Sequence, residues 1–327
     1  MRQTKPSSDL LRVVKWYARN VYGVHEGPGV PPYYCDPVRV GDFAVTPSAL
    51  ATGDEAVLFK LFVCIAMYQA LRDVVVMQRQ RSLTASEVGV VASLPVLTER
   101  IAQHSCVSLD ADLFEATCDV YKKDGSVECR RMPASPCHVK DATRIFGRMG
   151  DMGKLPTSAW FRSWRFGARS LLAQVVRCED NPRARAQLVA NRLAEIHRVG
   201  IKLASLYVSA LSVPALAPGL TPWFPTVDGD DLVVVDVHVA RAVDLVTRKR
   251  VPGSYTQRAA WVRSQAEMID LSAYDSRLPR RSPRIVQQAL YAFGSRSNRT
   301  ASRDSCVARS TACADCVSKL CPFAAAG

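Results

Sequence analysis

The sequence contains no apolar run long enough to cross a bilayer. Its most apolar segment, residues 56–77, is interrupted by Lys60, Arg72 and Asp73, whereas a spanning helix needs about 20 consecutive apolar residues. Residues 1–22 are basic and partly amphipathic, but they lack an apolar core followed by a small-residue cleavage site. No secretory signal is therefore predicted, and an organelle transit peptide stays open. We expect an intracellular protein with no membrane partner.

Acidic residues are the second shortage. The chain has 30 acidic against 43 basic residues, which gives a formal net charge of +13. Such an excess attracts polyanions and steers them toward the surface. Nucleic acid is the first candidate partner, and an anionic membrane surface is the second. A basic margin that serves solubility alone is the third interpretation.

The chain also lacks the dense, even set of cysteines that is typical of secreted disulfide frameworks. It has 11 cysteines in 327 residues, and four of them lie in the last 22. This distribution indicates a reducing compartment and one metal site. No repeat period is present, and 48% of the residues are hydrophobic. A length of this order fits two modest domains with real cores.

Helical periodicity dominates the apolar positions, so the fold class predicted is all-α. Residues 23–55 are rich in loops, and residues 104–157 have the character of an insertion. The apolar run LVVV at 232–235 fits a short strand or a buried helix equally well. Helices are expected over residues 56–80 (one helix or a pair), 158–178, 182–196, 201 onward, 255–272 and 285–293.

One pair of these helices is joined by a very short turn. Asn181 followed by Pro182 is a strong helix start, because Asn caps the free N–H groups and Pro suits the first turn. Residues 197–200, with the sequence HRVG, interrupt the periodicity, and a new helix is expected near Ile201. The local prediction is helix, short turn, helix.

The four C-terminal cysteines have the spacing C-x6-C-x2-C-x4-C, and Pro322 follows them. Four thiolates close in sequence can ligate one [4Fe–4S] cluster, because each iron needs one terminal ligand. Four-cysteine zinc is the main rival, and unligated structural cysteines are the third interpretation. The ligand candidates are Cys306, Cys313, Cys316 and Cys321. A second zinc site built from Cys118, Cys129, Cys137 and His138 is also conceivable, although its spacing matches no common ligand pattern and buried, idle thiols are favoured.

Three further motifs precede these cysteines in a fixed order. Residues 68–73 read YQALRD, residues 196–204 read IHRVGIKLA and residues 235–241 read VDVHVAR. Together they resemble the endonuclease III family of DNA glycosylases, the iron–sulfur branch of the helix-hairpin-helix superfamily. That family has QATD, then LPGVGxKxA, then VDTH[IV]xR, then C-x6-C-x2-C-x5-C. The resemblance extends over about 250 residues.

The chain departs from the family pattern at several positions. Arg198 replaces the first glycine of the hairpin, His197 replaces its proline, and Val237 replaces a threonine. The last interval of the cysteine motif is one residue shorter than in the family. These departures indicate a divergent branch. A non-glycine residue at 198 would be strained if its φ angle is positive.

The resemblance implies an architecture of two helical domains with a DNA-binding cleft between them. A six-helix barrel that carries the helix-hairpin-helix would span residues 56–228, with an insertion near 104–157. An iron–sulfur domain would combine residues 1–55 with 229–327.

The resemblance also implies two catalytic residues. Lys202 would attack the sugar as the base leaves, form a Schiff base and permit β-elimination of the 3′ phosphate. Asp236 would stabilise the oxocarbenium-like sugar or accept a proton from the amine. The structural alternatives are a surface lysine and a helix cap, respectively.

Other residues are expected to hold the DNA. Gln69 would fill the gap left by an extruded base, and the hairpin backbone would bind a phosphate. His238 is expected to have a structural role. The predicted DNA-binding residues are Gln69, Arg198, Val199, Gly200, Arg241, Arg303, Arg309 and Lys319.

The function that the resemblance implies is base-excision repair of DNA by a glycosylase with AP-lyase activity, acting as a monomer on double-stranded DNA with a damaged, mismatched or modified base. One alternative is a monofunctional glycosylase or a base-tailoring enzyme on modified pyrimidines. Another is a non-catalytic, redox-sensing DNA-binding protein, and a zinc-binding module is the third. The target base stays open, because the pocket residues lie outside the motifs.

Overall fold

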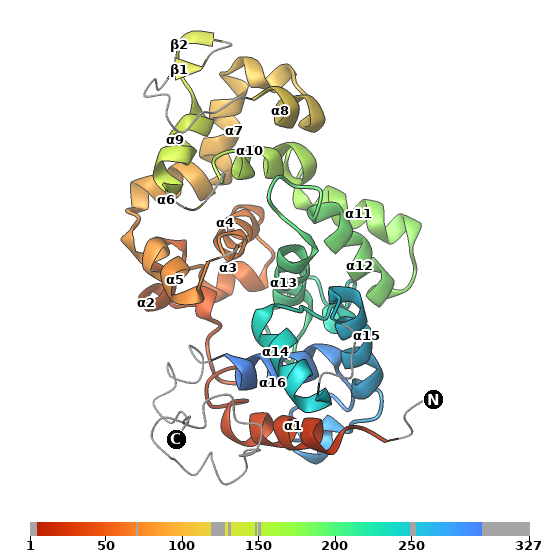
Figure 1. Cartoon of the computed structure of the whole chain (residues 1–327). Coiled ribbons are helices and arrows are strands. Elements are labelled where there is room, and N and C mark those ends of the chain that lie inside the picture. The colour runs from red at the N-terminus through yellow and green to blue at the C-terminus, as the bar shows by residue number, and fades with distance from the viewer. Residues whose placement is uncertain are drawn as a thin grey trace. The chain divides into compact units, whose positions relative to one another are not determined.

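The computed structural model describes most of the chain as helices joined by short turns (Figure 1). The described residues are 5–69, 71–118, 128–129, 132–147, 149, 152–248 and 253–295, with the backbone alone at 105, 128–129, 132–136 and 168–170. Apart from one two-stranded antiparallel pair, these residues form helices and loops. The prediction of an all-α fold class is confirmed.

The chain forms two compact units. The central unit comprises Tyr33–Val208, and the second unit, called here the terminal unit, combines Met1–Pro32 with Ser209–Gly327. The helix α13 (Ile201–Ser212) contains the boundary between them. The domain limits expected from the sequence, and a DNA-binding cleft between domains, stay predictions.

The central unit is a set of short helices. Its elements are η1 (Tyr33–Cys35), α2 (Pro37–Val40), η2 (Gly41–Phe43), α3 (Pro47–Ala51), α4 (Glu55–Ala66), α5 (Asp73–Ser82), α6 (Ala85–Ala92), α7 (Leu94–Ala102), η3 (Ser105–Ser108), α8 (Ala111–Thr117), β1 (Glu128–Cys129), β2 (Met132–Pro136), α9 (His138–Phe146), α10 (Leu155–Ala159), the π-helix η4 (Trp160–Trp164), α11 (Ala168–Cys178), α12 (Pro182–Leu193) and the start of α13. In the β pair, Glu128 faces Pro136 and Cys129 faces Met132, with an irregularity between them.

Aromatic side chains join three of these helices at the centre of the unit. The ring of Trp164 lies 5.3 Å from that of Phe59 and 4.9 Å from that of Phe62, measured between centroids. The Phe62 ring in turn lies 5.2 Å from Tyr207. The Tyr207 hydroxyl donates a hydrogen bond of 3.0 Å to the Leu58 carbonyl. These contacts fix α4, η4 and α13 against one another, because offset and edge-to-face rings add to the burial of apolar area.

The terminal unit contains fewer and longer helices. Its elements are α1 (Ser8–Asn20), η5 (Gly229–Asp231), α14 (Val237–Thr247), α15 (Tyr255–Ala266), η6 (Leu271–Ala273) and α16 (Pro283–Gly294). Buried apolar side chains of α1, α14, α15 and α16 make one core. Trp16 of α1 meets Phe293 of α16 edge to face at 6.0 Å. Segments from the two ends of the described chain are thereby packed together.

The end of α16 approaches α14 very closely. A Cβ atom built on Gly294 would lie 2.4 Å from the His238 carbonyl oxygen and 3.4 Å from the Ala242 Cβ. Such a separation is far below van der Waals contact, so only glycine fits here.

Several expected elements are present and others are not. The helix pair over residues 56–80 is confirmed as α4 and α5, and the two helices around the HRVG turn are confirmed as α12 and α13. Residues 232–235 are buried but form neither strand nor helix. The loop-rich segment 23–55 contains the short helices η1, α2, η2 and α3. Their Pro and Gly residues hid these single turns from a periodicity argument, which needs longer windows.

Candidate nucleic-acid interface

The turn between α12 and α13 is the centre of the candidate site. Asn181 caps α12, since its side-chain oxygen accepts bonds from the N–H groups of Arg183 (2.9 Å) and Ala184 (3.3 Å). After α12, the Val199 N–H donates to the Ile196 carbonyl at 2.9 Å, which closes the turn. The Val199 side chain is 2% exposed, so it packs inward.

Arg198 adopts a left-handed backbone conformation at the tip of this turn, with φ +65°. For an L-residue other than glycine this conformation costs about 1–2 kcal/mol. Gly200 does not have a positive φ, and a Cβ built on it meets nothing within 4 Å. The strain expected at Arg198 from the sequence is therefore present. The positive φ angle that favours glycine therefore occurs at position 198, where the chain has arginine.

Two side chains from distant segments bind the turn on either side of Arg198. The buried Ser158 hydroxyl of α10 accepts a bond of 2.9 Å from the His197 N–H. The Gln69 Nε2 donates to the Arg198 carbonyl at 3.4 Å. Gln69 lies in the turn after α4 and not within a helix, although the sequence predicts helix over residues 56–80. The structure thus brings Gln69 and the hairpin together.

The first N–H groups of α13 are open to an acceptor. Leu203 and Ala204 donate to the Gly200 carbonyl at 3.0 and 3.1 Å. In the part of the chain that the structure describes, the N–H groups of Gly200, Ile201 and Lys202 donate to no protein acceptor. Free N–H groups and the positive end of the helix dipole favour a phosphate at such a position.

Lys202 stands in the first turn of α13 and is partly exposed. Among the described residues its ammonium group pairs with no carboxylate and forms no hydrogen bond. Its amine is accordingly available to a ligand at the hairpin. Lys202 belongs to the central unit, and Asp236 belongs to the terminal unit.

Asp236 caps α14. Its Oδ1 accepts a hydrogen bond of 2.8 Å from the Val239 N–H, and the residue is partly exposed. Within the described residues, Oδ2 accepts no bond. The cap predicted as the structural role of Asp236 is confirmed, and it leaves one carboxylate oxygen accessible.

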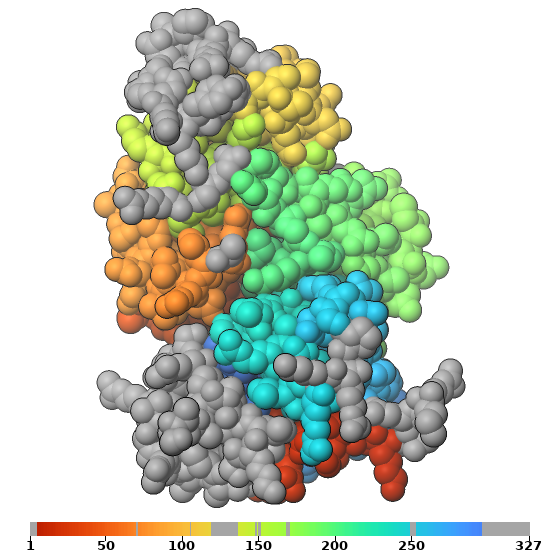
Figure 2. All heavy atoms as spheres, viewed as in Figure 1, coloured from red at the N-terminus to blue at the C-terminus, as the bar shows by residue number. Residues whose placement is uncertain are grey.

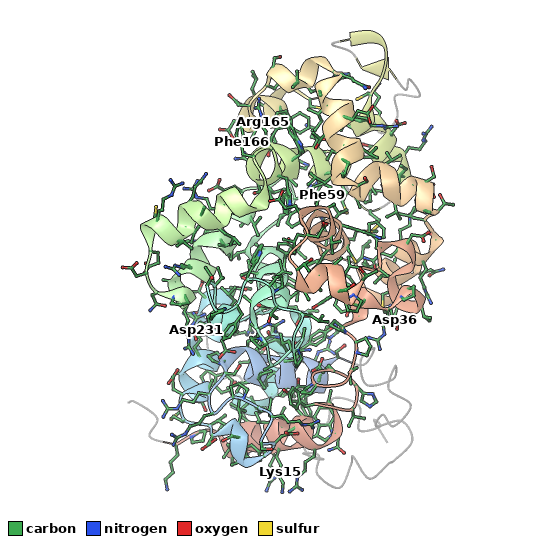
Figure 3. The ribbon with its side chains drawn as sticks, turned by 180° about the vertical axis from the view of Figure 1, so that it is seen from behind. Lys15, Asp36, Phe59, Arg165, Phe166 and Asp231 are labelled. Carbon is green, nitrogen blue, oxygen red and sulfur yellow. The ribbon has the colours of Figure 1, made fainter. Side chains whose placement is uncertain are left out.

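A residue that the sequence analysis missed lies just before α11. Phe166 is 81% exposed, the most exposed of the large hydrophobic side chains described. The Arg165 guanidinium carbon lies 5.6 Å from its ring centroid, and Figure 3 shows the two side chains together. An exposed aromatic beside an arginine suits stacking on nucleic-acid bases. The signal in the sequence was WRFG, an aromatic between a basic residue and a turn-forming glycine.

The helices α11 and α12 follow Phe166 and pack on each other. Their atoms form one continuous green surface in the space-filling view (Figure 2). Arg192 on α12 is exposed and has no ion pair among the described residues. Arg192 therefore provides an unpaired positive charge on α12, the helix that precedes the hairpin turn.

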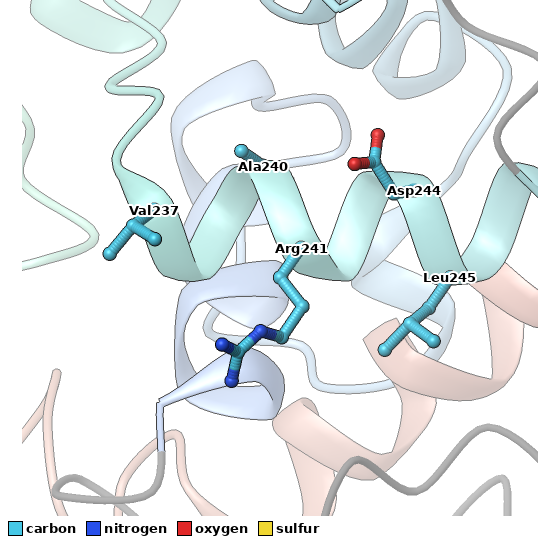
Figure 4. Close-up of a pocket in the computed structure, with 5 residues that line it drawn as sticks. All are labelled: Val237, Ala240, Arg241, Asp244 and Leu245. Carbon is cyan, nitrogen blue, oxygen red and sulfur yellow. The ribbon is translucent and has the colours of Figure 1, made fainter.

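On α14, one exposed face lines a hollow of about 350 Å³. Figure 4 shows its lining residues Val237, Ala240, Arg241, Asp244 and Leu245. The Asp244 carboxylate is occupied by Arg258, which donates from Nη2 at 2.8 and 3.0 Å. Arg241 is exposed and has no ion pair within the described ranges. Arg241 is therefore available to an anionic ligand, and its contact with a DNA phosphate stays a prediction.

The basic segment that begins at Arg277 is largely neutralised where the structure describes it. Each of three arginines there pairs with a carboxylate of the same unit: Arg277 with Asp275 (2.6 Å), Arg280 with Asp270 (3.4 Å) and Arg281 with Glu267 (3.2 Å). The Asp275 pKa is lowered, chiefly by its hydrogen bond from Arg277. These cations are engaged internally, so they add little to a phosphate-binding surface.

Arg284 is buried, with 3% of its surface exposed. Its Nη1 donates to the side-chain oxygens of Gln287 and, at 3.3 Å, Gln288. The Gln288 Nε2 then donates to Glu26 at 2.8 Å. Burial lowers the pKa of Arg284, and the Glu26 carboxylate acts in the opposite direction. This network ties the N-terminal loop to α16.

The four predicted cluster cysteines lie outside the described residues, and so do Arg303, Arg309 and Lys319. Of the alternative zinc ligands, Cys137 and His138 are buried, and the Cys129 side chain is not described. Among the residues whose side chains are described, no group of three or more His, Cys, Asp or Glu is arranged to hold a metal ion.

Comparisons with models of known families, with curated proteins and with solved structures found no match. Within the described residues, no helix is both long and apolar enough to span a membrane.

Proposed function

We propose that the protein is a DNA glycosylase of base excision repair that also cleaves the strand by β-elimination. The observation that carries the proposal is the turn between α12 and α13. It combines free N–H groups at the start of α13 with an unpaired amine, Lys202, in the same helical turn. A phosphate bound to those N–H groups would hold the sugar-phosphate backbone beside the amine.

Two further observations support a duplex as the substrate. Enzymes that act on a base must extrude it from the stack, which costs a few kcal/mol. Gln69, hydrogen-bonded to the hairpin, and Phe166, 81% exposed, are side chains that can occupy a gap in the stack. The net charge of +13 favours the polyanion over a neutral ligand.

The chemistry proposed for Lys202 needs its uncharged amine. The nitrogen forms a bond to the sugar C1′, and the bond from C1′ to the base breaks with its electron pair going to the base, which takes up a proton. Opening of the sugar ring gives the imine. Loss of a C2′ proton then expels the 3′ phosphate with the C3′–O electron pair. Asp236 supplies a carboxylate that stabilises positive charge on the sugar.

The cysteines 306, 313, 316 and 321 would hold a [4Fe–4S] cluster, since four thiolates are the donor set that such a cluster requires. The cluster has an architectural role in this proposal. A near-410 nm absorbance from anaerobically purified protein would separate iron from zinc.

Borohydride trapping on a duplex with one abasic site tests the lyase reaction. The native chain is expected to give a covalent adduct, which Lys202→Ala abolishes. The matched control is Lys60→Ala, because burial lowers the pKa of this central-unit lysine, and a lysine with a lowered pKa is the natural rival nucleophile. An adduct that survives in Lys202→Ala and disappears in Lys60→Ala would refute the assignment.

Incubation with a panel of lesion-bearing duplexes tests the glycosylase reaction separately. Release of a base without any trapped adduct would favour a monofunctional glycosylase. Tight duplex binding with neither base release nor adduct would favour a non-catalytic DNA-binding protein.

A further inference from the structure

Residues of the insertion reach the hairpin through a short chain of hydrogen bonds. Ser158 of α10 is fully buried, with an exposed fraction of 0%. Its hydroxyl accepts from the His197 N–H at 2.9 Å and lies 2.5 Å from Glu115 Oε1. A backbone N–H can only donate and a carboxylate can only accept, so the hydroxyl donates to Glu115. Both bonding directions of Ser158 are thus determined.

Glu115 belongs to α8, the first α-helix of the insertion. The same Oε1 accepts a bond of 2.9 Å from Arg162 Nε on η4. The Arg162 Nη2 donates to Asp112 at 2.7 Å, and its Nη1 lies 3.8 Å from a carboxylate oxygen of Glu195, three residues before Arg198. The side chains of Arg162 and Glu115 are only 18% and 22% exposed, so this pairing is shielded from solvent.

The bond from Ser158 acts next to the strained residue. His197 immediately precedes Arg198, whose φ is +65°. A non-glycine residue keeps such a conformation only where its surroundings impose it. Ser158 fixes the Ile196–His197 peptide, one residue before Arg198, and Gln69 binds the carbonyl of Arg198 itself. The tip is held on both sides by side chains that are distant in sequence.

We propose that Ser158, oriented by Glu115, is a positioning residue that maintains the left-handed turn at Arg198 and thereby aims the N–H groups of α13 at the DNA phosphate. In this arrangement Ser158, held by Glu115 of the insertion, supplies a brace that substitutes for the glycine missing from position 198. The inference rests on the proposed function for its DNA readout and on the turn geometry for its stability readout.

The experiment combines Ser158→Ala with Arg198→Gly in a double-mutant cycle. The DNA probe is a duplex with a tetrahydrofuran analogue of an abasic site, which binds without turnover. The matched control is Thr157→Ala, because Thr157 is the neighbouring α10 residue, is 1% exposed and makes no hydrogen bond to the hairpin among the described residues. Binding is measured together with the thermal midpoint for each variant.

With Arg198 present, Ser158→Ala is expected to weaken binding about tenfold, the effect of one hydrogen bond to a buried N–H. Thr157→Ala is expected to change it less than about twofold. In the Arg198→Gly background the loss from Ser158→Ala should shrink to less than about threefold, because glycine adopts the positive φ unaided. Equal losses in Ser158→Ala and Thr157→Ala, or an equal Ser158→Ala loss in both backgrounds, would overturn the proposal.

The stability arm separates this inference from the proposed function. If the native chain does not bind the abasic duplex, the proposed function fails, and the brace is judged by thermal midpoints alone. Coupling between Ser158→Ala and Arg198→Gly in the midpoint then supports the brace. Strictly additive midpoint changes overturn it.

Discussion

The buried imidazole of His138 gives the fold a predictable weakness in acid. His138 begins α9, is 4% exposed and lies edge to face with His104, with 5.5 Å between the ring centroids. Neither Nε2 atom has a hydrogen-bond partner. Burial, with smaller contributions from His104 and Arg100, lowers the pKa of His138 from 6.5 to about 4. The charged imidazole is therefore disfavoured in the folded state.

The size of the effect follows from linkage. Because the folded pKa lies below the unfolded value, the unfolded chain binds the proton first. Stability is complete above pH 6.5 and falls as the pH drops toward 4. At 1.36 kcal/mol per pKa unit, His138 costs about 2 kcal/mol at pH 5 and about 3 kcal/mol below pH 4.

Urea unfolding at pH 8 and pH 5 measures this difference. The native chain is expected to lose about 2 kcal/mol more than His138→Gln between the two values. Phe146→Leu is the control, since Phe146 is a buried apolar residue on the same helix and its replacement costs the same at both pH values. If His138→Gln loses as much stability as the native chain over this interval, the buried imidazole is not the cause.

Three other substitutions test separate parts of the structure. Arg198→Gly should leave the free energy of unfolding unchanged or raise it by up to ~1 kcal/mol, and so should Arg248→Gly at the left-handed end of α14. Only Arg198→Gly should also reduce, by about 0.9, the slope of the logarithm of the DNA-binding constant against the logarithm of the salt concentration. An unchanged slope would show that Arg198 does not contact a phosphate. Arg284→Ala should lower the free energy of unfolding by about 3–5 kcal/mol, because alanine leaves the buried partners without a cation or a filling side chain. Arg284→Met should lower it clearly less, and equal losses in the two variants would refute this reasoning. Phe166→Ala should weaken binding to an abasic duplex about tenfold, the value of one stacking contact, without changing the thermal midpoint. The control Val38→Ala, at a position 74% exposed, should change neither, and equal binding by the two variants would exclude a stacking role for Phe166.

Local signals predicted the hairpin well. Asn181 and Pro182 specify the start of α12 through bonds within three residues, and Asp236 specifies the start of α14 in the same way. The strain at Arg198 also follows from one position in a known type of turn. Such features depend only on residues that are close in the sequence, so they can be predicted without knowledge of the fold.

Features set by distant contacts could not be predicted. Nothing near Ser158 in the sequence indicates its bond to His197, and Gln69 was placed in a helix that ends before it. Arg284 lies in a segment rich in arginine, yet it is buried, and Gln288, one of its hydrogen-bond partners, is bound to the distant Glu26. Exposure of an aromatic such as Phe166 likewise depends on tertiary packing and not on local pattern.

Gly294 limits which residues can end α16. Because any side chain at this position would collide with the His238 carbonyl, the exit point of the chain from α16 cannot shift. Gly294 therefore anchors the end of α16 against α14. A change at the anchor itself would disturb α14, and with it the helix that Asp236 caps. Gly294→Ala therefore offers a way to disturb the packing of α16 on α14 without changing any cysteine.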